Sequence, residues 1–288
     1  MKKKILILGA YGYLGKILSA YLRTKYNVLR QSRNKKSKIV INKFNTKNIL
    51  KVLQENKPDF IINLIAITNL DFCEKNKTVT KRINTDIVYN IREAIKIYNE
   101  DSNCHLIHIS SDQVYSGVGP HKENKIRPIN YYGKSKFKGE IIGKKVNSTI
   151  LRVNFVGKNR RGKKSLSDWI VHSLRQKKEI IIFKDVYFNP LHTSELCKKI
   201  ETVIRKKITG TFNLGAKNSI SKANFALNLC KKLNLDKGLM KVGKITDSNL
   251  YAKRSNDTRM NVKKFEKQFI TSLGSIQKQI LLTVNEYK

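Results

Sequence analysis

Three glycines near the N-terminus constrain the fold of this chain more than any other feature. The apolar run KILILGA, residues 4–10, leads into AYGYLGK, so that Gly9, Gly12 and Gly15 lie three residues apart. Gly9 permits a tight turn, Gly12 lets the backbone approach a pyrophosphate, and Gly15 lets a helix pack close to the strand. The N-terminus of that helix offers unpaired N–H groups to an anion. The pattern therefore predicts a dinucleotide site at the first strand-to-helix turn.

Strand and helix patterns alternate along the first half of the chain. Continuous apolar runs predict further strands at 27–31, 38–41, 59–67, 105–110 and 148–155. Apolar residues at helical spacing predict helices at 13–26, 46–56 and 78–100. Thr46 is the expected N-cap of the second helix. This order predicts an α/β fold with a doubly wound parallel sheet, the Rossmann arrangement.

The alternation loosens after residue 157, where the basic segment KNRRGKKS begins. Helical patterns follow at 166–176, 193–207 and 220–235, with a strand pattern at 179–183. We expect a smaller C-terminal substrate lobe over the carboxyl edge of the sheet, where ligands bind in such folds. The predicted dinucleotide-binding domain spans 1–157 with 180–213 interleaved, and the predicted lobe spans 158–179 and 214–288.

Composition narrows the setting in which the protein works. Hydrophobic residues make up 40% of the 288 residues, which is enough for a core. No apolar run reaches the roughly 18 residues that a membrane span needs. The start MKKKILILGAYG fits a first strand better than a signal peptide. The four cysteines show no metal-ligand spacing, so we expect reduced thiols, no metal site, no membrane partner and a cytoplasmic protein.

The charge balance is strongly basic. Lys and Arg number 59 against 21 Asp and Glu, which gives a net charge of +38. The basic residues are spread along the whole chain and form no tail or compact stretch, so they fit solvated faces better than a specific nucleic-acid site. The positive field would still attract anionic small molecules.

The end of the second strand bears on the choice of cofactor. Preference for NAD usually requires an acidic residue there, to bind the ribose hydroxyls. The stretch LRQSRNKKSK contains no carboxylate. Ser32 and Arg33 are expected to hold a 2′-phosphate, with Lys35 or Lys36 nearby. The sequence therefore predicts NADP(H), with NAD(H) as the alternative.

The stretch NYYGKSKFKGE, residues 130–140, supplies a candidate acid. Residues four apart lie on one face of a helix, and Tyr132 has this spacing to Lys136, whereas Tyr131 faces Ser135 and is expected to pack or frame the pocket. A nearby ammonium stabilises a phenolate and lowers the pKa of the phenol. Tyr132 could then exchange a proton with a sugar oxygen, Lys136 could also hold the nicotinamide ribose, and Ser111 could bond the same oxygen. This spacing alone is common by chance, but together with the upstream glycine turn and the strand that ends in Ser111 it predicts a hydride-transfer site.

These pieces, in this order, resemble an extended short-chain dehydrogenase/reductase, and more narrowly the dTDP-4-dehydrorhamnose reductase group. KPDFIINLIAITNLDFCEKN is similar to PDxVINxAAxTxVDxAE, SSDQVYSG to STDYVFDG, and YYGKSKFKGE to YGxSKxxGE. LRVNFVG, FNPLHTSELC and AKRSNDTRMNVKKF resemble the later motifs of the group. The resemblance covers nearly the whole chain. It implies NADPH-dependent reduction of the 4-keto group of a nucleotide-linked deoxysugar.

The resemblance also implies roles for individual residues. It makes Ser111, Tyr132 and Lys136 the catalytic trio. The implied cofactor-binding residues are Gly9, Tyr11, Gly12, Tyr13, Leu14, Gly15, Ser32, Arg33, Ala66, Thr68 and Lys136. The implied substrate-binding residues are Asp112, Gln113, Asn154, Phe155 and Arg254. Relatives are often dimers, so a homodimer is expected by analogy.

The chain departs from the group's pattern at several positions. Gln113 replaces a usual tyrosine beside the sugar, and Lys43 stands where the group tends to have an aspartate near the adenine. RVNFVG lacks a tryptophan, and RSNDT lacks a proline. These departures concern substrate choice, so another 4-keto or 4-hydroxy deoxysugar nucleotide fits as well as the rhamnose precursor.

Other functions remain open from the sequence. The same scaffold supports sugar-nucleotide epimerases and dehydratases, although a 4,6-dehydratase usually has a glutamate after the aspartate that here is Asp112. Some relatives bind NADP without catalysis and lose the tyrosine, whereas Tyr132 and Lys136 are both present here.

Overall fold

The computed structural model describes residues 2–33, 37–159 and 165–288, and the chain divides into two compact units. The first unit comprises the chain up to Ser111 together with Asn130–Arg152 and Cys197–Phe212. The second unit comprises Asp112–Ile129, Val153–Leu196 and Asn213–Lys288. The predicted dinucleotide-binding domain also included 112–129, 153–157 and 180–196, which here belong to the second unit.

A seven-stranded sheet forms the centre of the first unit, in the order β11-β6-β5-β4-β1-β2-β3. Its strands are β1 (Lys4–Leu8), β2 (Asn27–Ser32), β3 (Ile39–Val40), β4 (Phe60–Asn63), β5 (His105–Ser111), β6 (Ser148–Val153) and β11 (Gly210–Leu214). The pairs of β1 with β2 and β4, of β2 with β3, and of β4 with β5 are parallel. The predicted doubly wound α/β fold is confirmed.

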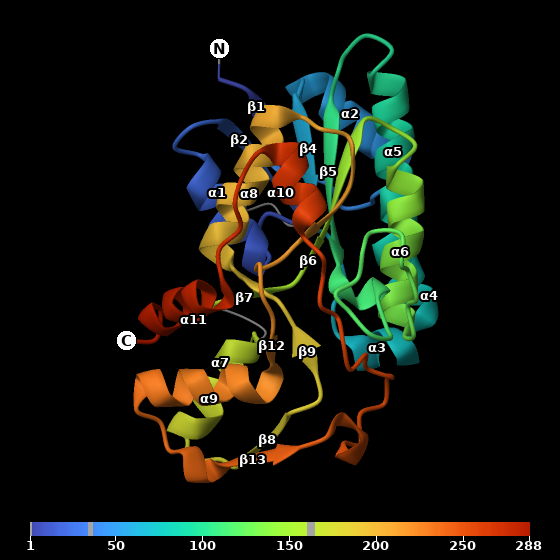
Figure 1. Ribbon diagram of the computed structural model, residues 1–288. Coiled ribbons are helices and arrows are strands. Elements are labelled where there is room, and N and C mark those ends of the chain that lie inside the picture. The colour runs from blue at the N-terminus through green and yellow to red at the C-terminus, as the bar shows by residue number, and fades with distance from the viewer. Residues whose placement is uncertain (1, 34–36, 160–164) are drawn as a thin grey trace. The chain divides into compact units, whose positions relative to one another are not determined.

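Helices cover both faces of this sheet, as Figure 1 shows, with α2, α5 and α6 on one face and α1 and α8 on the other. The helices of the first unit are α1 (Tyr13–Leu22), α2 (Thr46–Asn56), α3 (Leu70–Lys75), α4 (Lys77–Lys81), α5 (Ile87–Tyr98), α6 (Tyr131–Gly143) and α8 (Thr193–Lys206). Helices α2 and α5 bury aliphatic stripes against the sheet; the core there includes Leu6, Ile49, Leu53, Ile61, Ile91 and Ile95. Burying each such side chain stabilises the fold by about 1.5–3 kcal/mol.

Three details differ from the sequence expectations. The N-cap of α2 is Asn45 rather than Thr46, because the Asn45 side chain accepts from the Asn48 N–H at 2.8 Å. Strand β4 ends at Asn63 rather than at residue 67, since the segment after it leaves the sheet and lines a pocket. The predicted helix 78–100 is interrupted by a π-helical segment, Arg82–Asp86.

The second unit contains three two-stranded sheets, four complete α-helices and three short 3-10 helices among its described residues. The strands are β7 (Phe155–Val156), β8 (Ile180–Phe183), β9 (Tyr187–Phe188), β10 (Leu191–His192), β12 (Ile220–Ser221) and β13 (Met240–Gly243). The helices are α7 (Leu166–Arg175), α9 (Lys222–Leu233), α10 (Lys263–Phe269) and α11 (Ile276–Asn285). Its core includes Ile170, Leu174, Ile182, Phe225, Leu229 and Ile280.

Two expected absences concern the described residues only. None of the helices in this part of the chain is long and apolar enough to span a bilayer. Within the same residues no cluster of His, Cys, Asp and Glu could hold a metal ion. All four cysteines are buried free thiols, as predicted.

Candidate functional site

The glycine turn between β1 and α1 has the backbone that its sequence predicts. Gly9 adopts a φ of +77°, which L side chains rarely reach. A Cβ at Gly15 would lie 2.8 Å from the Ala10 Cα, so only glycine lets α1 pack this close to the turn. Gly12 is the N-cap of α1 and has no capping side chain. The turn therefore offers the backbone cradle that a dinucleotide phosphate requires.

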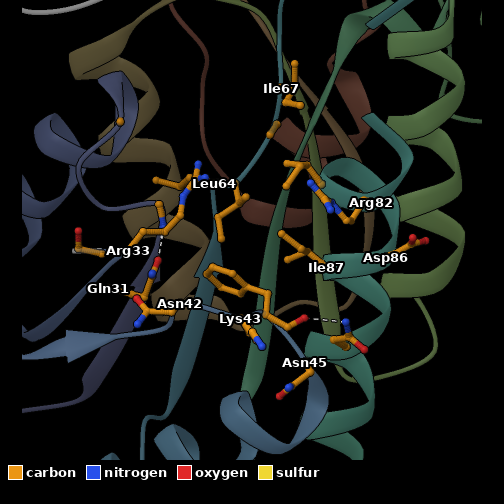
Figure 2. A pocket seen from close by; sticks show the side chains of 18 of the residues that line it. Gln31, Arg33, Asn42, Lys43, Asn45, Leu64, Ile67, Arg82, Asp86 and Ile87 are labelled. Atoms are coloured by element: carbon orange, nitrogen blue, oxygen red, sulfur yellow. Dashed lines mark hydrogen bonds between the residues drawn. The ribbon is translucent and has the colours of Figure 1, made fainter. Parts of the chain in front are cut away.

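A pocket of about 950 Å³ opens beside this turn, entirely within the first unit. Figure 2 shows Gln31, Arg33 and Asn42 on one side of it and Arg82, Asp86 and Ile87 on the other. Its remaining lining residues include Gly9, Tyr11, Gly12, Ser32, Lys43, Phe44, Leu64, Ala66, Ile67 and Asn90. A volume of this order is typical of small-molecule and cofactor pockets.

The pocket gathers part of the predicted cofactor set. It is lined by Gly9, Tyr11, Gly12, Ser32, Arg33 and Ala66, whereas Tyr13, Leu14, Gly15, Thr68 and Lys136 are not among its lining residues. Lys35 and Lys36, the other predicted phosphate contacts, lie outside the described residues. Lys43, which the sequence set apart as a departure, does line the pocket.

The charges at the pocket favour an anionic ligand. Its lining carries three cationic side chains, Arg33, Lys43 and Arg82, and one carboxylate, Asp86. Lys81 pairs with that carboxylate at 2.8 Å. The pocket edge near β2 therefore presents positive charge without a nearby acid among its lining residues.

Helix α6 positions the predicted catalytic pair. Asn130 caps the helix by accepting from the Gly133 N–H, so the helix begins at Tyr131. Tyr132 and Lys136 are both buried on its inner face, at 7% and 2% exposure. Helix α6 packs against β5, whose last residue is the buried Ser111. The three predicted catalytic residues thus belong to two elements in contact within the first unit.

The environment of Lys136 lowers its basicity. Burial lowers the pKa of Lys136 to about 8, and the Glu140 carboxylate opposes this shift. The Lys136 Nζ donates to the Ile109 carbonyl at 2.8 Å, which fixes the side chain along β5. A lysine with this pKa is mainly protonated at neutral pH and loses its proton in mildly alkaline solution.

A fully buried ion pair lies one helical turn beyond Lys136. The Arg152 Nη2 donates to Glu140 at 2.5 Å, and its Nε donates at 2.9 Å, in a two-pronged pairing with both side chains at 0% exposure. The Ser110 hydroxyl donates to the same carboxylate at 2.5 Å. The hydrogen bonds of this carboxylate thus join α6, β5 and β6.

The π-helical segment links the pocket to helix α6. The Asn84 Oδ1 accepts from the Ile67 N–H at 2.8 Å, and its Nδ2 donates to the Ile67 carbonyl and to the Ser135 hydroxyl, each at 3.0 Å. Gly139 permits this approach, because a Cβ there would lie 2.9 Å from the Asn84 carbonyl oxygen. Asn84 thereby connects a pocket-lining segment to the helix that carries Tyr132.

The predicted substrate-binding residues all belong to the second unit. Asn154 donates to the Asp112 carboxylate at 2.5 Å, and Gln113 donates to it at 3.4 Å. Lys222, at the start of α9, interacts electrostatically with both Asp112 and Arg254. Burial lowers the pKa of Lys222, the Asp112 carboxylate opposes this, and the Arg254 guanidinium adds to it. Phe155 lies on β7, partly buried.

Sequence reasoning missed several residues of these sites. Gln31, Asn84, Gly139, Glu140, Arg152 and Lys222 had no assigned role. The motif YYGKSKFKGE contains Gly139 and Glu140 and could have drawn attention to them. Gln31 stands about twenty positions after the glycine turn, and this spacing could have marked it. No local pattern marks Lys222, whose neighbours Asp112 and Arg254 come from distant parts of the chain.

Comparison with known proteins places these sites in a family. The chain matches the family described as RmlD substrate binding domain over residues 2–288. It is 24% identical over 274 residues to the Haloferax volcanii protein named probable low-salt glycan biosynthesis reductase Agl14, covering 90% of each chain. It is 23% identical to the Bos taurus methionine adenosyltransferase 2 subunit beta, over 92% of this chain and 82% of that one.

A solved structure shares the fold. The crystal structure of dTDP-4-dehydrorhamnose reductase from Bacillus anthracis, in complex with NADP, superposes with a TM-score of 0.89 at 23% identity. The similarity covers 99% of this chain and 100% of the other. Since the family match spans nearly every residue from the glycine turn to the C-terminal helix, the chain belongs to the RmlD substrate-binding domain family.

Proposed function

We propose that this protein reduces the 4-keto group of a nucleotide-linked deoxysugar with NADPH. The observation that carries the proposal is the buried pair of Tyr132 and Lys136 on α6, packed on the strand that ends at Ser111. The glycine turn and the cationic pocket of the same unit support NADPH as the cofactor. The Bacillus anthracis reductase of the same fold is in complex with NADP, which agrees with this choice.

The side chains have distinct roles in the proposed reaction. NADPH, when bound, supplies the hydride that adds to the keto carbon. The Tyr132 hydroxyl gives its proton to the carbonyl oxygen, and the Lys136 ammonium stabilises the phenolate that remains. The Ser111 hydroxyl donates to the same oxygen. Lys136 uses one of its three N–H donors on the Ile109 carbonyl, so its ammonium is held in place.

The proposed substrate contacts come from the second unit. Asp112, Gln113, Asn154 and Phe155 would border the sugar. Arg254 would hold the diphosphate, and Lys222, which interacts with Asp112 and Arg254, adds a second cation there. Proteins named for glycan and spore coat polysaccharide biosynthesis are among the relatives, which supports a role in supplying sugars for a polysaccharide.

A second candidate function has one observation in its favour. The similarity to a protein named as a subunit of methionine adenosyltransferase 2 supports the alternative that this chain is a non-catalytic NADP-binding subunit. The presence of Tyr132 and Lys136 favours catalysis. Loss of NADPH absorbance with a keto sugar separates the two functions, because only the reductase consumes the cofactor.

The test is a panel of nucleotide-linked 4-keto deoxysugars that differ in base and sugar, scored by loss of NADPH absorbance. We expect one subset to be reduced with stoichiometric NADPH consumption. Tyr132→Phe should lower kcat about 10²- to 10⁴-fold, since it removes the proton donor. Tyr131→Phe is the matched control. The Tyr131 ring faces Lys77, and its backbone N–H donates to Glu74. Tyr131→Phe keeps both contacts and removes only the hydroxyl, so kcat should stay within about threefold of the wild-type value. Equal rates for Tyr132→Phe and the wild type would refute the proposal.

A further inference from the structure

One buried amide beside the glycine turn has a hydrogen bond on its oxygen and none on its nitrogen among the described residues. Gln31, the penultimate residue of β2, is only 2% exposed and lines the pocket. Its Oε1 accepts from the Gly9 N–H at 3.2 Å, the dashed contact beside Gln31 in Figure 2. Strand β2 pairs with β1 in parallel register, Ile7 opposite Arg30, which brings residue 31 alongside the end of β1.

This contact fixes the orientation of the amide. A backbone N–H can only donate, so the oxygen of the Gln31 amide must face Gly9. The Nε2 group is consequently directed away from Gly9, with two N–H donors to place. Among the described residues it has no hydrogen-bond partner, although it is buried. A buried donor without an acceptor is unfavourable, so a ligand acceptor at this end of the pocket would be stabilised.

The neighbours of Gln31 show which acceptor fits. Ser32 and Arg33 follow it directly, and Lys43 lines the same pocket, so this edge offers donors and positive charge. In the Rossmann fold the residue about twenty positions after the glycine turn contacts the adenosine ribose, and an acid there accepts from the ribose hydroxyls. Gln31 lies at that distance from Gly9 and Gly12. Its free half is a donor where the acid would provide an acceptor.

We propose that Gln31 determines preference for a 2′-phosphate over a 2′-hydroxyl on the cofactor ribose, by anchoring the glycine turn with its oxygen and donating to the phosphate with its nitrogen. The proposal rests on the dinucleotide binding of the proposed function. A glutamate of the same shape would keep the Gly9 contact and replace the donor by a charged acceptor. A phosphate oxygen would then meet repulsion, whereas a ribose hydroxyl could donate to the carboxylate.

The test compares Gln31→Glu with the wild type in direct binding. Dissociation constants are measured by fluorescence titration for NADPH and NADH, and by calorimetry for adenosine 2′,5′-bisphosphate and AMP, with no sugar substrate present. We expect the wild type to prefer the phosphorylated ligand of each pair. Gln31→Glu should weaken the phosphorylated ligands about 10- to 100-fold and leave the unphosphorylated ones within about threefold.

Two further variants exclude simpler explanations. Asn45→Asp adds the same charge to the same pocket, and aspartate still caps α2, so it keeps the fold but cannot reach Gly9. Through screened charge alone it should weaken NADPH by less than about threefold. Gln31→Met keeps the side-chain length without a donor and should weaken NADPH more than NADH. This variant keeps the test decisive if the buried glutamate unfolds the chain.

The outcomes separate this inference from the proposed function. An unchanged ratio of NADPH to NADH affinity in both Gln31 variants, with normal wild-type binding, overturns the inference alone. An equal effect of Asn45→Asp and Gln31→Glu also overturns it, because charge would then suffice. Wild-type binding of neither dinucleotide overturns both proposals. The expected shift in ratio, in a wild type that reduces no keto sugar, upholds the inference and refutes the reductase.

Discussion

Helix α6 and the pocket beside the glycine turn, both in the first unit, differ in how their polar groups are paired. Around α6, buried charges have protein partners: Lys136 donates to a backbone carbonyl and Glu140 pairs with Arg152. In the pocket, the Gln31 nitrogen has no partner among the described residues, and Arg33 and Lys43 are exposed. Groups satisfied by the protein hold its shape and set pKa values, whereas donors left over determine which ligand binds. Each prediction below tests one side of this contrast.

The largest expected effect concerns the buried pair. Arg152→Met leaves the Glu140 carboxylate without its cation at a fully buried site, and should lower the free energy of unfolding by about 3–5 kcal/mol. Urea denaturation measures this change. Lys51→Met is the control, because the exposed Lys51–Glu55 pair, 3.8 Å apart, should contribute less than about 0.5 kcal/mol. Similar losses in the two variants would remove the distinction between the two regions.

The second prediction concerns the pH dependence of the proposed activity, which is set by Lys136 of α6. Since burial lowers the pKa of Lys136 from 10.5 to about 8, its ammonium is lost as the pH rises through about 8. The value of kcat/KM should therefore fall about tenfold per pH unit above that point, because neutral lysine no longer stabilises the phenolate. Glu140→Gln removes a charge that raises this pKa, so it should move the alkaline limb to lower pH. A profile that stays flat across pH 8 would contradict the assignment.

The same pKa shift has a consequence for stability with the opposite sign. Between about pH 8 and pH 10.5 the unfolded chain holds a proton on Lys136 that the folded chain has lost. This group alone therefore makes the free energy of unfolding rise with pH over that interval. Lys136→Met should flatten that part of the stability profile, as measured by urea denaturation at a series of pH values.

The third prediction concerns the exposed cations of the pocket. Arg33→Met should weaken NADPH binding about tenfold at low salt and change NADH binding little, because only NADPH carries the 2′-phosphate. The difference between variant and wild type should shrink as salt is added, since exposed charges are screened. Fluorescence titration at two salt concentrations measures both effects. Equal weakening of both dinucleotides would place Arg33 elsewhere than at the 2′ position.

The smallest expected effect concerns the wall of the pocket. Asn45→Ala removes the N-cap of α2 and should lower the free energy of unfolding by about 1 kcal/mol. Asn45→Ser keeps a capping oxygen and should change the free energy of unfolding by only about 0.3 kcal/mol. Thermal unfolding of both variants would show whether this helix start depends on the cap.

Several features of the fold and of the candidate site can be predicted from local sequence patterns. The glycine turn joins two consecutive elements, and Tyr132 and Lys136 lie four residues apart on one helix, so short-range spacing alone brings these groups together. The parallel sheet followed from apolar runs that are buried on both faces, as in β4 and β5. Thr46 was the predicted N-cap of α2, but Asn45 directly before it caps the helix, and asparagine is the more favourable of the two residues at that position.

The rest depended on contacts between distant segments. The hydrogen bond between Gln31 and Gly9 joins the ends of the neighbouring strands β2 and β1. The ion pair joins Arg152 of β6 to Glu140 of α6. The inner face of α6 includes Tyr132, Lys136, Gly139 and Glu140, so an apolar stripe does not mark it. The apolar spacing of residues 78–100 does not indicate the π-helical segment. The extra residue of this segment is associated with the contact of Asn84 with Ser135, which lies far away in the sequence.

That extra residue makes chain length at this point as important as chemistry. A regular helix turns about 100° per residue, so deleting one position within Arg82–Asp86 would rotate everything before it by that angle relative to α5. Arg82 and Ile83 would rotate away from the pocket that they line, and the Asn84 amide, which now bonds both Ile67 and Ser135, would lose at least one of these partners. The segment should consequently be more sensitive to the loss of one residue than to a substitution of its exposed Arg82.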